Sequence, residues 1–153
     1  MHTNTFQGNY KMSNNINFDQ RLSYYQIGSE RREVLKTSQA DIMKVLPTIL
    51  DDFYDFVSSH PVSKDKFQGK ALEGLKKVQG EHWRTLFSGD FSPEYTQRSI
   101  EIGQIHERIG ITPFLYMGGY TFVLTKLTDY IIETCGGNKK KCKTLIRAVS
   151  AAI

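Results

Sequence analysis

The 153-residue sequence is poor in the features that mark secreted or membrane-spanning proteins. Its two cysteines, Cys135 and Cys142, are too few for a disulfide framework, and their spacing differs from the C-x-x-C of zinc and redox sites. No apolar run approaches the roughly 20 residues that cross a bilayer. The N-terminus also lacks the apolar core of a signal peptide. The sequence therefore predicts a cytoplasmic protein with reduced thiols and no membrane segment.

Strong charge is also absent, since 20 Lys and Arg residues against 16 Asp and Glu residues leave a formal net charge of +4. Nucleic-acid binding needs clustered cations, so no nucleic-acid partner is expected. The basic cluster at residues 139–143 is interpreted as a solvated helix corner, with a docking surface for an acidic partner as the alternative. An apolar share of 39% is enough for one hydrophobic core.

Strand signals are nearly missing, whereas apolar residues recur every three or four positions almost throughout. The predicted fold class is all-α, a bundle of six or seven helices. Pro47 is expected to bend or divide the first long run into two joined helices, and the polar stretch SKDKFQGK is interpreted as a connector. Ser92-Pro93 and Thr112-Pro113 read as helix starts. The expected helices cover residues 29–59 in two parts, 72–88, 93–109, 113–135 and 138–153.

Residues 1–18 are predicted to be a disordered or leader segment, because Met12 opens a second plausible start. Residues 19–153 form one predicted domain, since no linker rich in Pro, Gly or Ser divides them. The last helical pattern has no stop signal. The final helix is therefore expected to be truncated, as in a piece of a longer protein.

Two histidines, His82 and His106, lie beside apolar helical stripes and are the candidates for chemistry. The HExxH pattern of zinc proteases would need a second histidine where Gly110 stands, and no G-x-S-x-G motif or phosphate-binding loop occurs. Periodicity and spacing leave two interpretations of these histidines open: hydrogen-bonded core residues or ligands.

The string IGQIHERIGITPFLYMGGY, residues 102–120, resembles the proximal segment of globin-coupled sensors. Three further strings keep the order of that family, and the resemblance covers the chain from about Leu22 to its end. It implies a globin-like fold with an extra N-terminal helix and non-covalently bound haem b, iron protoporphyrin IX. The strings are LSYYQIGSERREVLK, LDDFYDFVSSHP and LKKVQGEHWRTLFSGDFSPEY.

The resemblance also implies roles for single residues. His106 matches the proximal histidine that ligates haem iron, and Tyr54 matches the distal tyrosine that donates a hydrogen bond to bound dioxygen. An ordinary core tyrosine is the alternative for Tyr54. His82 is a possible sixth ligand, and Trp83 is interpreted as a packing residue. Leu75, Val78 and Gln79 are expected on the distal side, and Phe53, Phe67, Ile105, Ile109 and Tyr120 are expected haem contacts.

Taken together, the resemblance implies a haem-based sensor of dioxygen, with carbon monoxide or nitric oxide as further ligands. Such a domain binds gas without catalysis and regulates a C-terminal output module, a chemotaxis transducer or a diguanylate cyclase, or in some members a kinase. It is expected to form a homodimer through the helices at residues 113–135 and 139 onward. The alternatives are a globin enzyme that detoxifies nitric oxide or peroxide, and a haem-free helical interaction domain.

Overall fold

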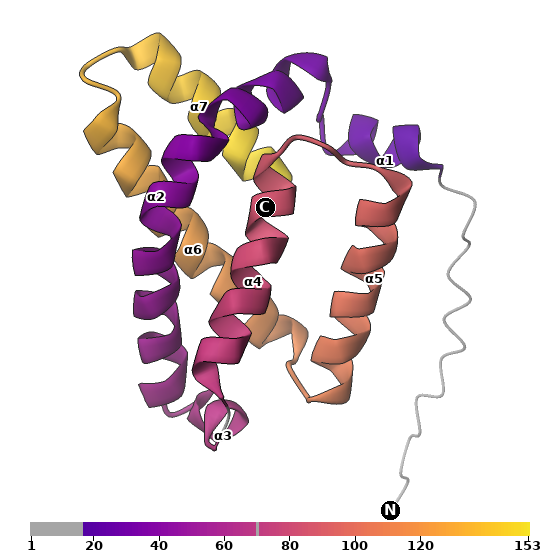
Figure 1. The fold of residues 1–153 in the computed structure, drawn as a ribbon, viewed down its shortest axis with the longest axis vertical. Coiled ribbons are helices and arrows are strands. Elements are labelled where there is room, and N and C mark those ends of the chain that lie inside the picture. The colour runs from indigo at the N-terminus through magenta and orange to yellow at the C-terminus, as the bar shows by residue number, and fades with distance from the viewer. Residues whose placement is uncertain (1–16, 70) are drawn as a thin grey trace, which may run out of the picture.

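The computed structural model describes residues 17–69 and 71–153, and over these residues the chain forms helices and no strands (Figure 1). The all-α prediction is confirmed. The predicted extra N-terminal helix is present as α1, while the predicted leader falls mostly outside the described residues. None of the described helices is both long and apolar enough to span a membrane. The elements are α1 (Phe18–Tyr24), α2 (Ser29–Ser59), α3 (Lys64–Phe67), α4 (Leu72–Phe87), α5 (Pro93–Arg108), α6 (Pro113–Thr134) and α7 (Lys139–Ala152).

The helix starts predicted from Ser-Pro and Thr-Pro pairs are confirmed by their capping hydrogen bonds. The Ser92 hydroxyl accepts from the backbone N–H of Tyr95 at 3.3 Å, with Pro93 as the first residue of α5. The Thr112 hydroxyl accepts from the N–H of Leu115 at 3.4 Å at the start of α6. Each side chain satisfies one backbone donor that the first helical turn leaves unpaired.

Two expectations from the sequence, the division into two helices and the connector, are wrong. Pro47 does not divide its run, because α2 continues through it as one 31-residue helix. The helix changes direction along its length, which agrees with the expected alternative of a bend (Figure 1). Buried residues on both sides of the proline, Leu46 and Ile49 among them, keep the helix packed on the core despite the lost hydrogen bond. The supposed connector contains α3, a single turn too short to show a helical period.

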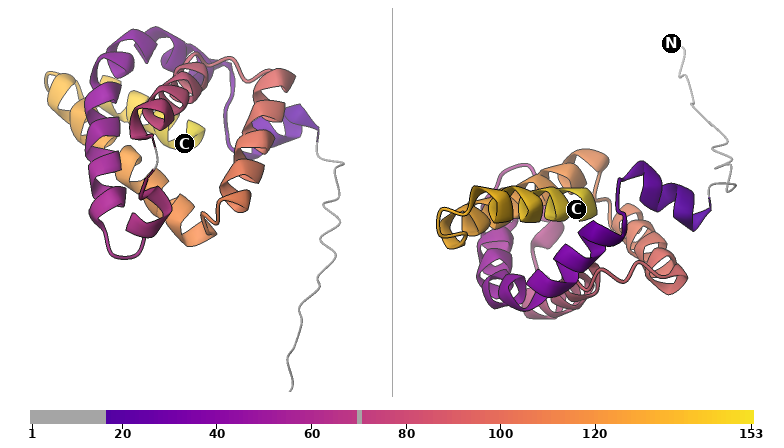
Figure 2. Two further views of the ribbon diagram at one scale, coloured as in Figure 1. Left: turned by 60° about the horizontal axis from the view of Figure 1, so that its bottom comes forward. Right: turned by 90° about the horizontal axis from the view of Figure 1, so that it is seen from above.

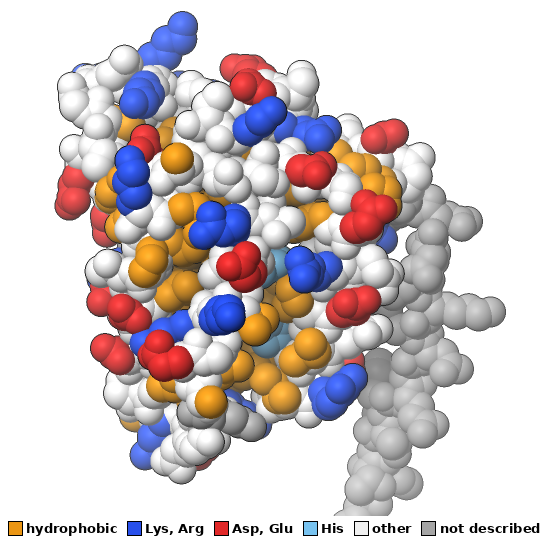
Figure 3. Space-filling view, viewed as in Figure 1, with side chains coloured by type: hydrophobic (Ala, Val, Ile, Leu, Met, Phe, Trp, Pro, Cys, Tyr) orange, Lys and Arg blue, Asp and Glu red, His pale blue; other side chains and the backbone are white. Residues whose placement is uncertain are grey.

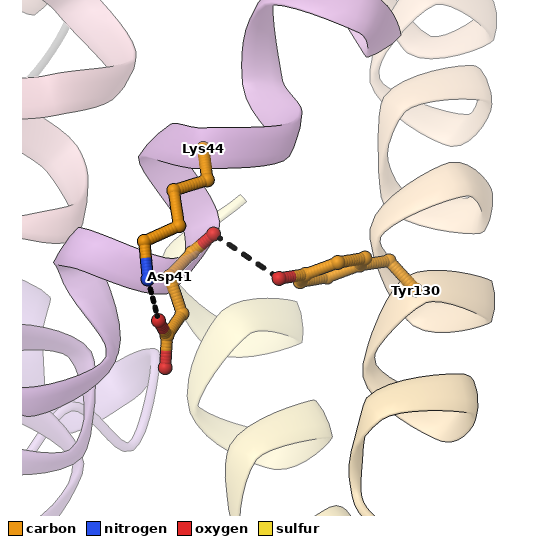
Figure 4. A network of polar contacts seen from close by, with 3 residues as sticks. All are labelled: Asp41, Lys44 and Tyr130. Carbon is orange, nitrogen blue, oxygen red and sulfur yellow. Dashed lines mark hydrogen bonds and ion pairs between the residues drawn. The ribbon is translucent and has the colours of Figure 1, made fainter.

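The core is organised around α2, which packs against α3, α4, α6 and α7. A polar contact supports the α2–α6 packing: the Tyr130 hydroxyl donates to the Asp41 carbonyl at 3.4 Å, and Lys44 pairs with the Asp41 carboxylate at 2.8 Å (Figure 4). Among the described helices, α5 differs, because it has no buried residue and no extensive contact with another helix. It stands apart from α4 in two views (Figures 1 and 2).

Candidate functional site

An apolar cavity of about 400 Å³ lies among α2, α4, α5 and α6, and the segment around α3 contributes to its wall. This volume is within the range of small-molecule and cofactor sites. No lysine, arginine, aspartate or glutamate is among its lining residues. All the residues proposed from the sequence line this one cavity: Phe53, Tyr54, Phe67, Leu75, Val78, Gln79, His82, Ile105, His106, Ile109 and Tyr120.

His106 reaches the cavity from α5, where helical spacing places Ile102, Ile105 and Ile109 on the same wall. Burial lowers the pKa of His106, so the imidazole is neutral at pH 7. The nearby backbone carbonyl of Ile102 opposes this shift of the pKa, but it does not form a hydrogen bond with the His106 Nδ1 atom. The rings of His106 and Tyr116 pack in a T-shaped arrangement, with their centroids 5.2 Å apart. A neutral imidazole in an apolar wall is suited to bind a metal through one nitrogen.

Tyr54 reaches the same cavity from α2 and is 5% exposed. Its ring packs edge to face on Phe53 and Phe67, at centroid distances of 5.1 and 6.1 Å. Burial raises the pKa of Tyr54 to about 12, so the phenol keeps its proton. No described group hydrogen-bonds to its hydroxyl. Tyr54 therefore has a free O–H donor for a ligand in the cavity.

His82 lines the cavity from α4, and its ring lies nearly parallel to that of Tyr95 at 6.2 Å, with 10° between the planes. Burial, then the charge of Arg98, and last the nearness of the titratable His106 ring lower the pKa of His82. The cavity thus receives two neutral imidazoles from different helices. Two further buried atoms of lining residues, Gln79 Oε1 and Trp83 Nε1, have no hydrogen-bond partner.

The residues present fit a large, flat, apolar group that carries its own metal. Apolar side chains of the cavity are left in contact with solvent, with Val78 on α4 68% exposed and Ile105 on α5 50% exposed. Figure 3 shows histidine side chains at the bottom of a hollow lined by hydrophobic atoms on this face. The described residues contain no cluster of three or more potential ligands for a bare ion. A single histidine is therefore sufficient only if an organic ring supplies the other metal ligands.

Several lining residues were predicted from the sequence to have another role or none in the site. Trp83, interpreted from the sequence as packing, is 2% exposed and does pack on Phe87, yet it also lines the cavity. His60 and Gly119 line the cavity as well, although neither was predicted to be a site residue. A Cβ atom at Gly119 would lie 3.2 Å from Phe53 Cε2, so this glycine lets α2 and α6 approach closely. Two adjacent glycines inside a helical pattern were the available signal.

Comparison with known proteins agrees with this geometry. Residues 14–153 match the Protoglobin family. Over 115 residues, 74% of the chain, the sequence is 31% identical to the haem-based aerotactic transducer HemAT of Halobacterium salinarum, and the match spans only 24% of that longer protein. The fold resembles the globin domain of a Geobacter sulfurreducens globin-coupled sensor, with a TM-score of 0.81, 18% identity, and coverage of 88% of this chain and 89% of that one. The globin-like fold is thereby confirmed, and the chain belongs to the Protoglobin family.

Proposed function

We propose that this domain holds haem b in the cavity and senses a diatomic gas, dioxygen in the first place. One observation carries the proposal: a neutral histidine from α5 and a free, protonated phenol from α2 line the same apolar cavity. Membership of the Protoglobin family and the similarity to HemAT, a haem-based aerotactic transducer, support it.

The roles of the side chains follow from their chemistry. When bound, ferrous haem supplies an iron that takes up diatomic gases reversibly. His106 would hold the iron through one imidazole nitrogen, which is available because burial keeps the ring neutral. Tyr54 would donate its O–H to dioxygen, which becomes partly negative on binding, more strongly than to carbon monoxide. The apolar walls exclude water, which would otherwise compete for the same donor.

We further propose that the domain passes its ligand state to an output module in cis and forms a homodimer through α6 and α7. The chain spans about a quarter of the transducer it matches, which is consistent with a sensor segment of a longer protein. The route begins at His106 on α5, passes Gly110 to Thr112, and enters α6 at Pro113. A displacement of α5 would therefore reach the proposed dimer helix across a short connection.

The first test is the optical spectrum of the purified chain after haemin is added and reduced. We expect a Soret band in the wild-type protein and loss of most bound haem, or a scrambled ferrous spectrum, in His106→Ala. Removing His106 would delete the bond by which the protein is proposed to hold the iron. His82→Ala is the matched control and should keep the wild-type ferrous spectrum.

Each other result supports a different interpretation. A wild-type chain without a Soret band would be the haem-free interaction domain. Rapid turnover of nitric oxide or peroxide would favour the globin enzyme. A His106→Ala variant with wild-type haem content and spectrum would show that another residue is the iron ligand.

A further inference from the structure

Lys66 lies against the cavity rim, with its ammonium close to the backbone of Gly110. Its Nζ atom is 2.8 Å from where a Cβ atom would stand on Gly110, at the corner between α5 and α6. Ile109 and Ile111, which flank Gly110, both line the cavity, as do Ser63 and Phe67 around α3. The ammonium of Lys66 is thus placed where the α3 wall meets the α5–α6 corner.

The cavity itself offers no charge to an anionic group, because no lining residue is a lysine or an arginine. A tetrapyrrole with carboxylate side chains would therefore need its cations at the rim. Burying the carboxylates in the apolar interior without a partner would cost more than the ring gains there. The carboxylate edge must lie toward solvent, where a lysine stem can lie on apolar atoms while its ammonium stays hydrated.

Lys66 is available for this task because its charge is not paired with an acid among the described residues. Among the described residues, the ion pairs join other cations, Lys44, Lys76, Arg84 and Lys126, to their acids. Within residues 17–69 and 71–153, Lys66 has no polar interaction beyond its backbone hydrogen bonding in the α3 turn. The side chain is exposed, and its ammonium lies against backbone rather than against an acid.

We propose that Lys66 pairs with a carboxylate of the bound tetrapyrrole and so helps to hold it between α3 and the α5–α6 corner. The inference rests on the proposed function, because it assumes that a carboxylate-bearing haem enters the cavity. Lys66 on α3 would thus be a further binding residue, in addition to the residues already described that face the ring.

The experiment compares two ligands, haemin and haemin dimethyl ester, which has the same iron and ring but no free carboxylate. Entry of either ligand is detected by quenching of Trp83, the single tryptophan of the chain and a lining residue. The first-order rate of ligand loss to an excess of haem-free acceptor protein is then measured by absorbance. The variants are Lys66→Met and Lys66→Arg, with Lys64→Met as the control on the same helical turn.

We expect Lys66→Met to lose haemin about twofold to fivefold faster than the wild type, a range that corresponds to a solvent-exposed ion pair. The difference should shrink at high ionic strength, because salt screens exposed charges. Lys66→Arg and Lys64→Met should lose haemin at nearly the wild-type rate. With the dimethyl ester, all four proteins should lose the ligand at the same rate.

Three results would overturn the inference. Equal rates of haemin loss from Lys66→Met and wild type would show that Lys66 does not pair with the carboxylate. If Arg98→Met then lost haemin faster, Arg98, whose charge lies near His82, would be the partner of the carboxylate instead. Faster loss of both ligands from Lys66→Met would reduce Lys66 to a packing residue. If neither ligand quenches Trp83 in the wild type, the proposed function fails as well, whereas the first two results leave it standing.

Discussion

Tyr54 and Tyr120 both line the cavity, yet their hydroxyls are in different situations. The Tyr120 hydroxyl is hydrogen-bonded to the Tyr116 hydroxyl at 2.9 Å, and burial raises the pKa of Tyr120. The Tyr54 hydroxyl has no partner among the described residues and has a pKa of about 12. Of these two phenols, Tyr54 is therefore the one whose hydroxyl is not shared with another described side chain.

Tyr54→Phe should speed dioxygen release about tenfold to a hundredfold, because a hydrogen bond to a charged partner contributes about 1.5–3 kcal/mol. Carbon monoxide release should change much less. Stopped-flow measurements decide between these outcomes, with Tyr120→Phe as the control whose hydroxyl is already engaged. In the wild type, the raised pKa predicts no phenol titration in the release rate up to about pH 10. Equal acceleration for both gases would contradict the selective donor.

The glycine pair of α6 allows a second comparison between single residues. A Cβ on Gly119 would press on Phe53 Cε2 at 3.2 Å, whereas one on Gly118 would meet nothing within 4 Å. Gly118→Ala should therefore stabilise the helix by about 0.5–1 kcal/mol through backbone entropy. Gly119→Ala should fall short of that gain by about 1 kcal/mol or more, because Phe53 must shift in its packing. Urea unfolding of the two variants measures the difference, and equal free energies of unfolding would show that Phe53 yields freely.

Among whole elements, α5 is held differently from the others. Near its first turn, Tyr95 packs edge to face on Phe91 and parallel to His82, with centroid distances of 5.3 and 6.2 Å. Further along, Ile105 and Ile109 are 50% and 45% exposed and face solvent or cavity rather than another helix. Without a group in the cavity, little apolar burial holds the second half of α5 in place.

Hydrogen exchange should show this difference between the elements. We expect amides in the second half of α5 to exchange much faster in the haem-free protein than after haemin is bound, because the bound ring supplies the missing contacts. Amides at the centre of α2 should be protected alike in both forms and serve as the internal control. Mass spectrometry of peptides from each helix gives the comparison. Slow exchange of α5 in the haem-free protein would mean that the helix is stable without a ligand.

For the whole molecule, the sequence predicts those features of the fold and the site that depend on neighbouring residues or on a long family motif. Proline, serine and glycine signals located the ends of α4, α5 and α6, since capping uses residues next to each other in the chain. The family motif brought His106 and Tyr54 forward as a pair, although 52 positions separate them in the sequence. Lys66 beside Gly110 had no such signal, because their approach exists only after α3 and the α5–α6 corner have folded together. The continuity of α2 through Pro47 likewise depends on core packing that local propensity does not contain.

The central place of α2 has a mechanical consequence. One continuous helix that packs on α3, α4, α6 and α7 forms a stiff frame, since a packed interior resists small deformations. The helix that carries His106 is attached to this frame mainly at its two ends, by Phe91 and Tyr95 at one and by the short link into α6 at the other. If the proposed function holds, a displacement of His106 would meet least resistance along α5, and the stiff frame would pass the remainder on to α6. The direction of such a signal would then be set by the place where α5 joins α6.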